Sequence, residues 1–140
     1  MLCKEKINAG NFRRFGKIIE YPKKSLASRK KNLFCKVITE PGKTGWRIAY
    51  LVVRDKAIDR LERHTGTLES FEPVKGKCLL YLAQAKSKRS LRCFYLDRPV
   101  VLKKGTWHGV VVLGKEAEIK ITENARVKSE YWRLGFSLKG

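Results

Sequence analysis

Short runs of apolar, aromatic and β-branched residues recur along the chain. The most hydrophobic is Trp46–Val53, which reads WRIAYLVV and predicts a buried strand. Proline and glycine in the preceding segment, Pro41–Gly45, are typical of a turn. We therefore expect Leu33–Thr39 to pair with Trp46–Val53 in a hairpin.

The same pattern continues toward the C-terminus, with turn residues between the runs. The further predicted strands are Cys78–Ala83, Leu91–Leu96, Val100–Leu102, Trp107–Leu113 and Glu116–Thr122. The last of these alternates charged and apolar residues, as a half-exposed strand does. Strands at this spacing favour an all-β sandwich or barrel, here a single domain over residues 1–140.

Three segments are less regular. Asn11–Glu20 is expected to carry a helical turn, so that the fold begins with a short helical or irregular segment. Tyr21–Lys31 is basic and is expected to be a mobile loop. The aromatic segment Tyr131–Phe136 predicts either an added strand or a dimer contact.

The chain is strongly basic, with a net charge of +19 over 140 residues and 43% hydrophobic residues. Such a charge would attract nucleic acid, anionic membranes or acidic metabolites. The basic residues are scattered, however, and neither zinc-finger spacing nor an RNA-binding aromatic motif accompanies them. We therefore expect a solvated basic surface, without specific nucleic-acid binding and without a membrane partner.

Four cysteines, Cys3, Cys35, Cys78 and Cys93, are far apart and form no CxxC pair. The first residues lack the unbroken apolar core of a signal peptide, and no run approaches the length of a transmembrane helix. We expect reduced thiols that are buried as small hydrophobic groups in a cytoplasmic protein.

The chain holds two histidines, and each lies in a short motif. The motifs are Glu62-Arg63-His64 followed by Glu69, Phe71, Pro73 and Gly76, and Gly105-Thr106-Trp107-His108. These spacings match halves of the two motifs of the cupin barrel, in which paired strands direct imidazoles and a carboxylate into the barrel mouth. We expect Gly76 and Gly105 to lie in turns that need positive φ.

The segment from Glu62 to Pro73 resembles the glutamate-arginine-histidine to phenylalanine-x-proline stretch of the ureidoglycolate lyase family, a member of the cupin superfamily. Cys93-Phe94 with Gly105–His108 is similar to that family's second signature, and Phe12–Glu20 resembles its N-terminal opening. The resemblance implies a cupin-type (RmlC-like) β-barrel. It also implies cleavage of ureidoglycolate to glyoxylate and urea.

The chain departs from the family pattern close to the predicted site. Family members often carry tyrosine and histidine where this chain has Leu102 and Lys103. Several carry glutamine at the position of Glu69. These differences leave the substrate open and favour small dicarboxylates or other 2-oxo and 2-hydroxy acids as alternatives.

The predicted site consists of His64, Glu69 and His108, which could act directly as acid and base. They could instead bind a divalent metal as a set of two histidines and one carboxylate, with Zn, Ni, Mn or Fe as candidates and Glu62 as a further oxygen ligand.

Candidate substrate-binding residues are Arg54, Lys103 and Trp107, the first two as anion binders. For Trp107 core packing is the favoured alternative. Arg63 alternates with Glu62 and His64 along a strand and should face away from both.

The leading hypothesis is a ureidoglycolate lyase-like enzyme acting on a small carboxylate, as a homodimer. One alternative is a non-catalytic cupin that binds a small anion or sugar. Another is a basic nucleic-acid-binding barrel.

Overall fold

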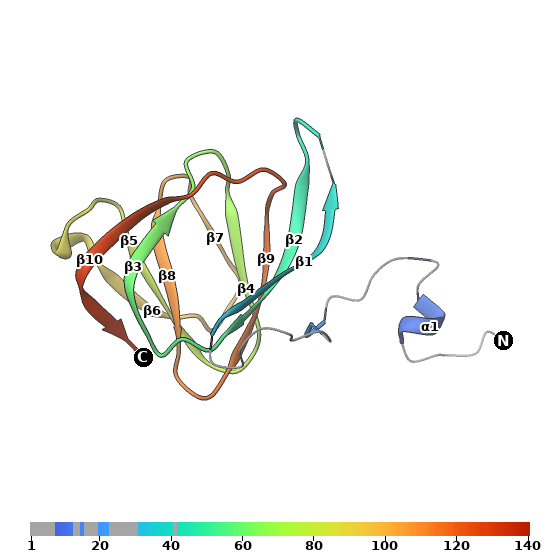
Figure 1. Cartoon of the computed structure of the whole chain (residues 1–140), viewed down its shortest axis with the longest axis horizontal. Coiled ribbons are helices and arrows are strands. Elements are labelled where there is room, and N and C mark those ends of the chain that lie inside the picture. The colour runs from blue at the N-terminus through green and yellow to red at the C-terminus, as the bar shows by residue number, and fades with distance from the viewer. Residues whose placement is uncertain (1–7, 13–14, 16–19, 23–30, 41) are drawn as a thin grey trace.

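The computed structural model describes residues 8–12, 15, 20–22, 31–40 and 42–140. Almost all regular structure is β, in two antiparallel five-stranded sheets (Figure 1). The prediction of an all-β fold is confirmed. A short helix, α1 (Ala9–Phe12), precedes the strands and overlaps the predicted helical turn. Most of the rest of that segment and most of the predicted loop Tyr21–Lys31 lie outside the described residues.

The first sheet has the strand order β1-β2-β9-β4-β7. Its strands are β1 (Leu33–Glu40), β2 (Trp46–Val53), β9 (Ala117–Asn124), β4 (Glu69–Lys75) and β7 (Val100–Leu102). The second sheet has the order β10-β3-β8-β5-β6. Its strands are β10 (Glu130–Lys139), β3 (Ala57–Arg63), β8 (Trp107–Val112), β5 (Cys78–Ala83) and β6 (Arg92–Tyr95), with a short 3-10 helix at Lys88–Ser90.

The predicted hairpin is formed by β1 and β2, which pair antiparallel from Leu33 opposite Val52 to Glu40 opposite Trp46. The amide of Gly45 donates to the carbonyl of Gly42 at 3.2 Å and closes the turn. The apolar run of β2 and the turn before it therefore predicted both strands and their pairing, and Ala49, Tyr50, Val52 and Val53 of β2 are buried.

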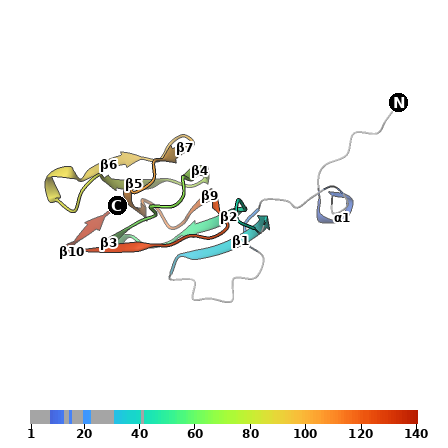
Figure 2. The ribbon, with the colours of Figure 1, turned by 90° about the horizontal axis from the view of Figure 1, so that it is seen from above.

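The main core lies between the two sheets. Along β9, Ala117, Ile119 and Ile121 point inward and are buried, and Val110 and Val112 of β8 face them from the second sheet. Viewed from above, β6 and β7 lie on one side of this interior, with β3 and β10 on the other (Figure 2). Each such aliphatic side chain stabilises the fold by about 1.5–3 kcal/mol when it is fully buried.

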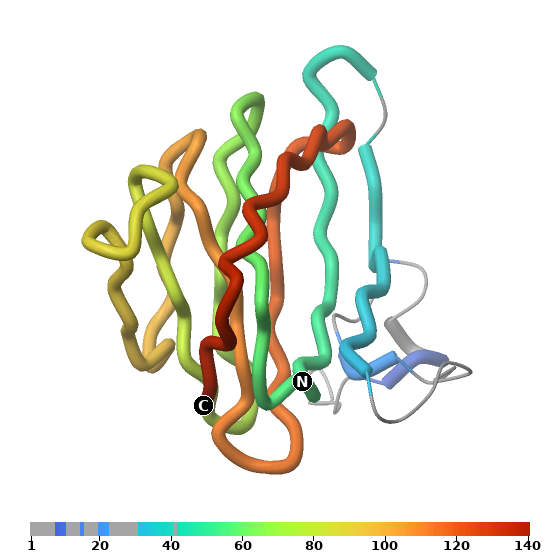
Figure 3. Tube along the Cα trace, turned by 60° about the vertical axis from the view of Figure 1, so that its left-hand side comes forward, coloured from blue at the N-terminus to red at the C-terminus, as the bar shows by residue number. Residues whose placement is uncertain are grey.

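A second hydrophobic cluster includes Trp107, Leu61 and Leu134. The rings of Trp107 and Trp132 meet edge to face, with centroids 6.0 Å apart. β10 supplies Trp132 and Leu134 and pairs antiparallel with β3, as the trace shows (Figure 3). The aromatic C-terminal segment is thus an added strand of this chain.

Three cysteines are described, and all are free thiols. Cys78 is buried as expected, but Cys35 is half-buried and Cys93 is exposed, which corrects the prediction of uniformly buried thiols. Cys93 lies on β6, a sheet edge whose four residues are all exposed. Among the described residues, no helix has the length and apolar character needed to cross a membrane.

Candidate functional site

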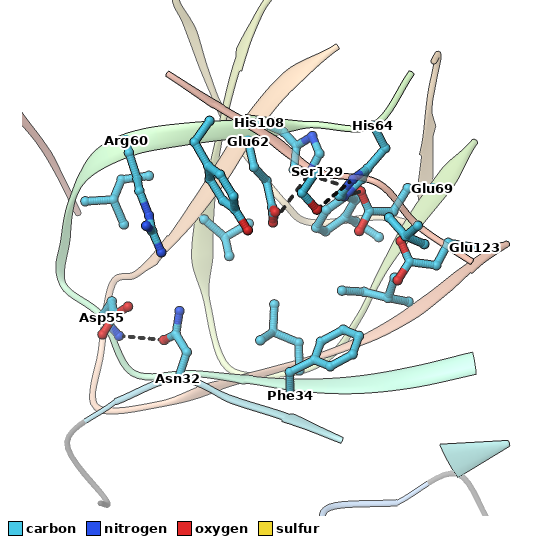
Figure 4. A pocket seen from close by; sticks show the side chains of 18 of the residues that line it. Asn32, Phe34, Asp55, Arg60, Glu62, His64, Glu69, His108, Glu123 and Ser129 are labelled. Atoms are coloured by element: carbon cyan, nitrogen blue, oxygen red, sulfur yellow. Dashed lines mark hydrogen bonds and ion pairs between the residues drawn. The ribbon is translucent and has the colours of Figure 1, made fainter. Parts of the chain in front are cut away.

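Strand pairing brings four buried acid and base side chains together inside the barrel. His108 of β8 lies opposite Glu62 of β3, and His64 follows directly after that strand. Glu69 begins β4 and lies opposite Glu123 of β9 in the facing sheet. Figure 4 shows these side chains converging on one wall of a cavity.

Glu69 is the centre of this cluster. Its Oε2 lies 3.0 Å from Nε2 of His108 and 3.4 Å from Nε2 of His64. The two imidazole rings are 5.2 Å apart between centroids. Oε1 of the half-exposed Glu62 lies 3.8 Å from Nε2 of His108. The structure therefore brings together His64 just after the end of β3, His108 on the neighbouring β8 and Glu69 of the facing sheet, with both histidines directed inward as expected.

Backbone carbonyls fix the orientation of both imidazoles. Nδ1 of His64 lies 3.2 Å from the carbonyl oxygen of Lys128, and Nδ1 of His108 lies 3.0 Å from that of Thr106. A carbonyl can only accept, so Nδ1 of neutral His108 carries the proton, and its Nε2 presents a lone pair to Glu69, the arrangement that metal-binding histidines use. Nδ1 of His64 also lies 3.3 Å from the hydroxyl of Ser129, and when Nδ1 donates to Lys128 its Nε2 presents a lone pair in the same way.

Two atoms at the centre of the cluster are buried without a hydrogen-bond partner, Oε2 of Glu69 and Nε2 of His108. In the neutral site both are acceptors, so their 3.0 Å approach leaves two lone pairs facing each other. Burial alone lowers the pKa of His108, but hydrogen bonding and attraction to Glu69 outweigh burial and raise it. A proton shared between Oε2 of Glu69 and Nε2 of His108, or a divalent cation bound to both, would satisfy these two atoms.

Glu123 belongs to the same cluster, although the sequence interpretation did not include it. Arg47 donates to Oε1 of Glu123 from Nε at 2.9 Å and from Nη2 at 2.6 Å. Oε2 is buried and has no partner. Burial, followed by repulsion from Glu69, raises the pKa of Glu123 although Arg47 opposes the shift. The sequence did indicate that Glu123 points inward, because it continues the alternation of the buried residues Ile119 and Ile121 along β9.

The residues present fit a divalent metal. Two sets have ligand atoms within 4.8 Å of one another, Glu62 with His64 and His108, and His64 with Glu69 and Glu123. Imidazole nitrogen with carboxylate oxygen suits Zn, Ni, Mn or Fe. Three carboxylates face a single arginine here, so the cluster has an excess of negative charge that a cation would neutralise.

The cluster lines one end of a cavity of about 500 Å³. Apolar side chains, among them Leu51, Phe71, Val110 and Ile121, form part of its wall. Further lining residues are Asn32, Phe34, Asp55, Arg60 and Tyr131 (Figure 4). A cavity of this volume is in the range of small-molecule sites.

The three expected substrate-binding residues lie outside the lining of this cavity. Nε of Arg54 pairs with Glu116 at 2.8 Å, and its Nη2 donates to the hydroxyl of Tyr21 at 2.6 Å. Trp107 is 1% exposed and packs in the second cluster, because it precedes His108 on β8 and points to the other face. Lys103 is exposed and lines a separate small hollow that also touches His64, Glu69 and His108.

Arg63 faces away from the cavity, as the alternation along its strand predicts. Its guanidinium pairs with Glu130 at 2.8 Å and lies 4.6 Å from the ring centroid of Trp107. β3 therefore presents Arg60 and Glu62 to the cavity and Arg63 to the opposite face.

The fold resembles solved structures that share little sequence with this chain. The crystal structure of CapF with the inhibitor 3-isopropenyl-tropolone matches with a TM-score of 0.58 and 16% identity, over 69% of this chain and 29% of that one. L-ribose isomerase from Acinetobacter sp. DL28, in complex with L-ribose, matches with a TM-score of 0.56 and 10% identity, over 66% of this chain and 58% of that one. Peruvianin-I, a cysteine peptidase from Thevetia peruviana latex, matches with a TM-score of 0.59 and 13% identity, over 75% of this chain and 69% of that one.

These similarities show the fold, which is a cupin-type β-barrel as predicted. This chain spans only 29% and 58% of the CapF and L-ribose isomerase chains. The sequence matches no protein-family model. A search of curated proteins finds no match either. Membership of the ureidoglycolate lyase family therefore stays a prediction.

Proposed function

We propose that the protein is a metal-dependent cupin enzyme that acts on small carboxylates, with ureidoglycolate cleavage as its specific reaction. The observation that carries the proposal is the convergence of two imidazole Nε2 atoms on the buried, unpartnered Oε2 of Glu69. The Glu62–Pro73 resemblance supplies the choice of substrate.

His64, Glu69 and His108 are the proposed ligands, since Oε2 of Glu69 lies 3.4 Å and 3.0 Å from the two Nε2 atoms. Glu62 lies at the exposed side of the cluster, with a carboxylate oxygen close to the ligand nitrogens of both histidines. A divalent ion bound there would act as a Lewis acid on a substrate oxygen and bring its hydroxyl proton within reach of a carboxylate base. The carbonyls of Lys128 and Thr106 would keep the imidazoles in the ligating tautomer.

The reaction needs one proton to move. The substrate hydroxyl loses its proton, the carbon–oxygen double bond of glyoxylate forms, the carbon–nitrogen bond breaks, and the departing urea nitrogen gains a proton. Glu123 is the proposed carrier, because it lines the cavity, its Oε2 has no hydrogen-bond partner and its pKa is raised above its usual value. Arg47 holds the other oxygen in place.

The test is glyoxylate release from ureidoglycolate above the spontaneous rate, measured with Zn²⁺, Ni²⁺, Mn²⁺ or Fe²⁺. We expect His108→Ala and Glu69→Gln to abolish release, and Glu123→Gln to lower it about 100-fold while metal binding persists. Glu72→Gln is the control, since Glu72 lies on the same strand as Glu69 but pairs with Lys120 at 2.9 Å outside the cavity lining.

Two outcomes would contradict the proposal. Activity retained in His108→Ala and Glu69→Gln would place the chemistry elsewhere. A cavity that binds such acids without turnover would instead indicate the non-catalytic cupin, for which the absent tyrosine-histidine pair at Leu102 and Lys103 is the supporting observation.

A further inference from the structure

The cavity has a second polar region at some remove from the histidines. Arg60, Asn32 and Asp55 lie together on the opposite side of the cavity from Glu69 and Glu123 (Figure 4). Among the described residues, this region contains the one arginine of the cavity lining that has no carboxylate partner.

The cavity is lined by two cations, Arg47 and Arg60. Arg47 is engaged by Glu123. The guanidinium of Arg60 instead lies over the ring of Tyr131, 4.8 Å from its centroid, and no described carboxylate pairs with it. Stacking on an aromatic ring restrains the planar fork while its N–H groups remain able to donate.

Asn32 supplies a second donor at this end. Its Oδ1 accepts from the backbone amides of Arg54 at 2.7 Å and of Asp55 at 2.9 Å. These two bonds fix which atom of the amide is oxygen, so Nδ2 is the end that remains available. The close-up shows this nitrogen directed toward the interior of the cavity on the side of Arg60 (Figure 4).

Apolar side chains form much of the remaining lining. Leu51, Phe71, Val110 and Ile121 contribute to it, and Phe71 contacts His108. A ligand that matches this lining has an oxygen-rich group at the histidine cluster, an apolar middle and an acceptor at Arg60 and Asn32. At about 500 Å³, the cavity also has room for an acid longer than two carbons.

We infer that Arg60 and Asn32 bind a second anionic group at the far end of the cavity, so that the site also binds extended dicarboxylic acids beside the small carboxylate of the proposed reaction. This inference rests on the proposed function, which places one oxygen-bearing end of the ligand at His64, Glu69 and His108. Asp55 lines the same end and offsets the charge of Arg60. Recognition must therefore come from directed N–H donors more than from net charge.

The experiment uses the full chain loaded with Zn²⁺ and measures binding by calorimetry. The probes are straight-chain dicarboxylates from malonate to adipate, each compared with the monocarboxylate of equal carbon number. We expect one dicarboxylate to bind at least about 10-fold more tightly than its matched monocarboxylate. The chain length of that dicarboxylate gives the distance between the histidine cluster and the region of Arg60 and Asn32.

Two variants test the assigned residues. Arg60→Gln should remove the preference for the dicarboxylate, and Asn32→Asp should remove it while keeping the Oδ1 acceptor that the two backbone amides need. Arg63→Gln is the matched control, because it removes the same charge from the same strand on the opposite face. It should retain the preference.

A separate Zn²⁺ titration of each protein distinguishes this inference from the proposed function. If Zn²⁺ binds but the wild type shows no preference for any dicarboxylate, or Arg60→Gln retains that preference, the inference is overturned and the proposed metal site stands. If no protein binds Zn²⁺ but the preference is present and depends on Arg60, the inference stands and the proposed function fails.

Discussion

At the scale of single residues, the site depends on which face of a strand each side chain occupies. Trp107 and His108 are adjacent on β8, yet one packs in the second cluster and the other faces the cavity. The same alternation places Arg63 outside and Glu62 inside. Applied to Trp107, this rule would have excluded it from the substrate-binding set from sequence alone.

The histidine pair was predictable because the chain offers only two, each at a spacing found in cupin motifs. Glu123 and Arg60 were harder to identify, since a charged residue on a strand usually faces solvent. Their inward direction follows from strand register, which neighbouring strands determine. The same applies to Arg54, which pairs with Glu116 of another loop instead of facing the cavity.

His64→Ala should remove metal from the protein. Loss of one of two imidazole ligands leaves carboxylates that bind first-row metals more weakly, so we expect at least about a 10-fold loss of affinity. Elemental analysis of purified wild type and variant measures this directly. Equal metal content in both would show that His64 is not a ligand.

The cysteines should differ sharply in reactivity. Burial raises the pKa of Cys78 to about 11, so its reactive thiolate is scarce at pH 8, whereas Cys93 is exposed. When the protein is labelled with a thiol reagent at pH 8, the number of rapidly reacting thiols should fall by one in Cys93→Ser and stay the same in Cys78→Ala. Rapid labelling that disappears with Cys78→Ala would contradict the burial of that thiol.

At the scale of elements, β2 and β5 were predictable because their apolar runs form the core. β3 was not on the list of predicted strands, because it reads AIDRLER and carries charges on both faces. The physical reason is that its inner face lines a polar cavity. A strand that builds a site loses the hydrophobic alternation by which strands are recognised.

Two turn glycines offer a matched test of backbone constraint. Gly76 and Gly105 have φ of 75° and 79°, as the turn prediction requires. A Cβ at Gly76 would overlap the carbonyl oxygen of Glu116 and lie 2.8 Å from Cα of Ala117, whereas at Gly105 nothing lies within 4 Å. Gly105→Ala should cost about 1 kcal/mol and Gly76→Ala about 3 kcal/mol.

Urea unfolding of the two variants measures the difference in the free energy of unfolding. The prediction concerns the order of the two costs, since both substitutions share the left-handed backbone and differ in the space around it. Equal losses would mean that β9 shifts readily to make room at Gly76.

At the scale of the whole molecule, charge is sorted between inside and outside. Four of the 13 acidic residues, Asp55, Glu62, Glu69 and Glu123, line the cavity, while 32 lysines and arginines give the chain its net charge of +19. A positive surface around a small site increases the encounter rate with anions. For the proposed carboxylate substrate, the high charge would therefore raise the rate of encounter.

The rate of substrate capture should therefore fall as ionic strength rises. We expect kcat/KM for an anionic substrate to decrease several-fold between about 0.02 and 0.2 M salt, because the Debye length shortens from about 20 to 7 Å. Stopped-flow or initial-rate measurements at several salt concentrations test this. A kcat/KM that is independent of salt would remove steering as the reason for the charge.

The homodimer stays a prediction, and its expected contact is now β10. This strand lies at the edge of the second sheet, and Tyr131 on it is 52% exposed. Deleting residues 130–140 would not be a clean test, because β10 completes the second hydrophobic cluster. Tyr131→Lys is milder, since it keeps the strand and replaces a half-exposed ring by a charge, although it also removes the ring over which Arg60 lies in the cavity.

Light scattering at tens of micromolar should give a dimer mass for the wild type and a monomer mass for Tyr131→Lys. Tyr95→Lys, on β6 at the opposite edge of the same sheet, is the control and should remain dimeric. A monomeric wild type would exclude the dimer, and dissociation by Tyr95→Lys alone would place the contact on β6.

The hydrogen bond between His64 and the carbonyl of Lys128 has a consequence for biosynthesis. Lys128 lies between β9 and β10, so it is translated after every other residue of the cluster has left the ribosome's peptidyl-transferase centre. His64 gains this contact only when that late segment docks. The orientation of the His64 ring is therefore among the last features of the candidate site to form during synthesis.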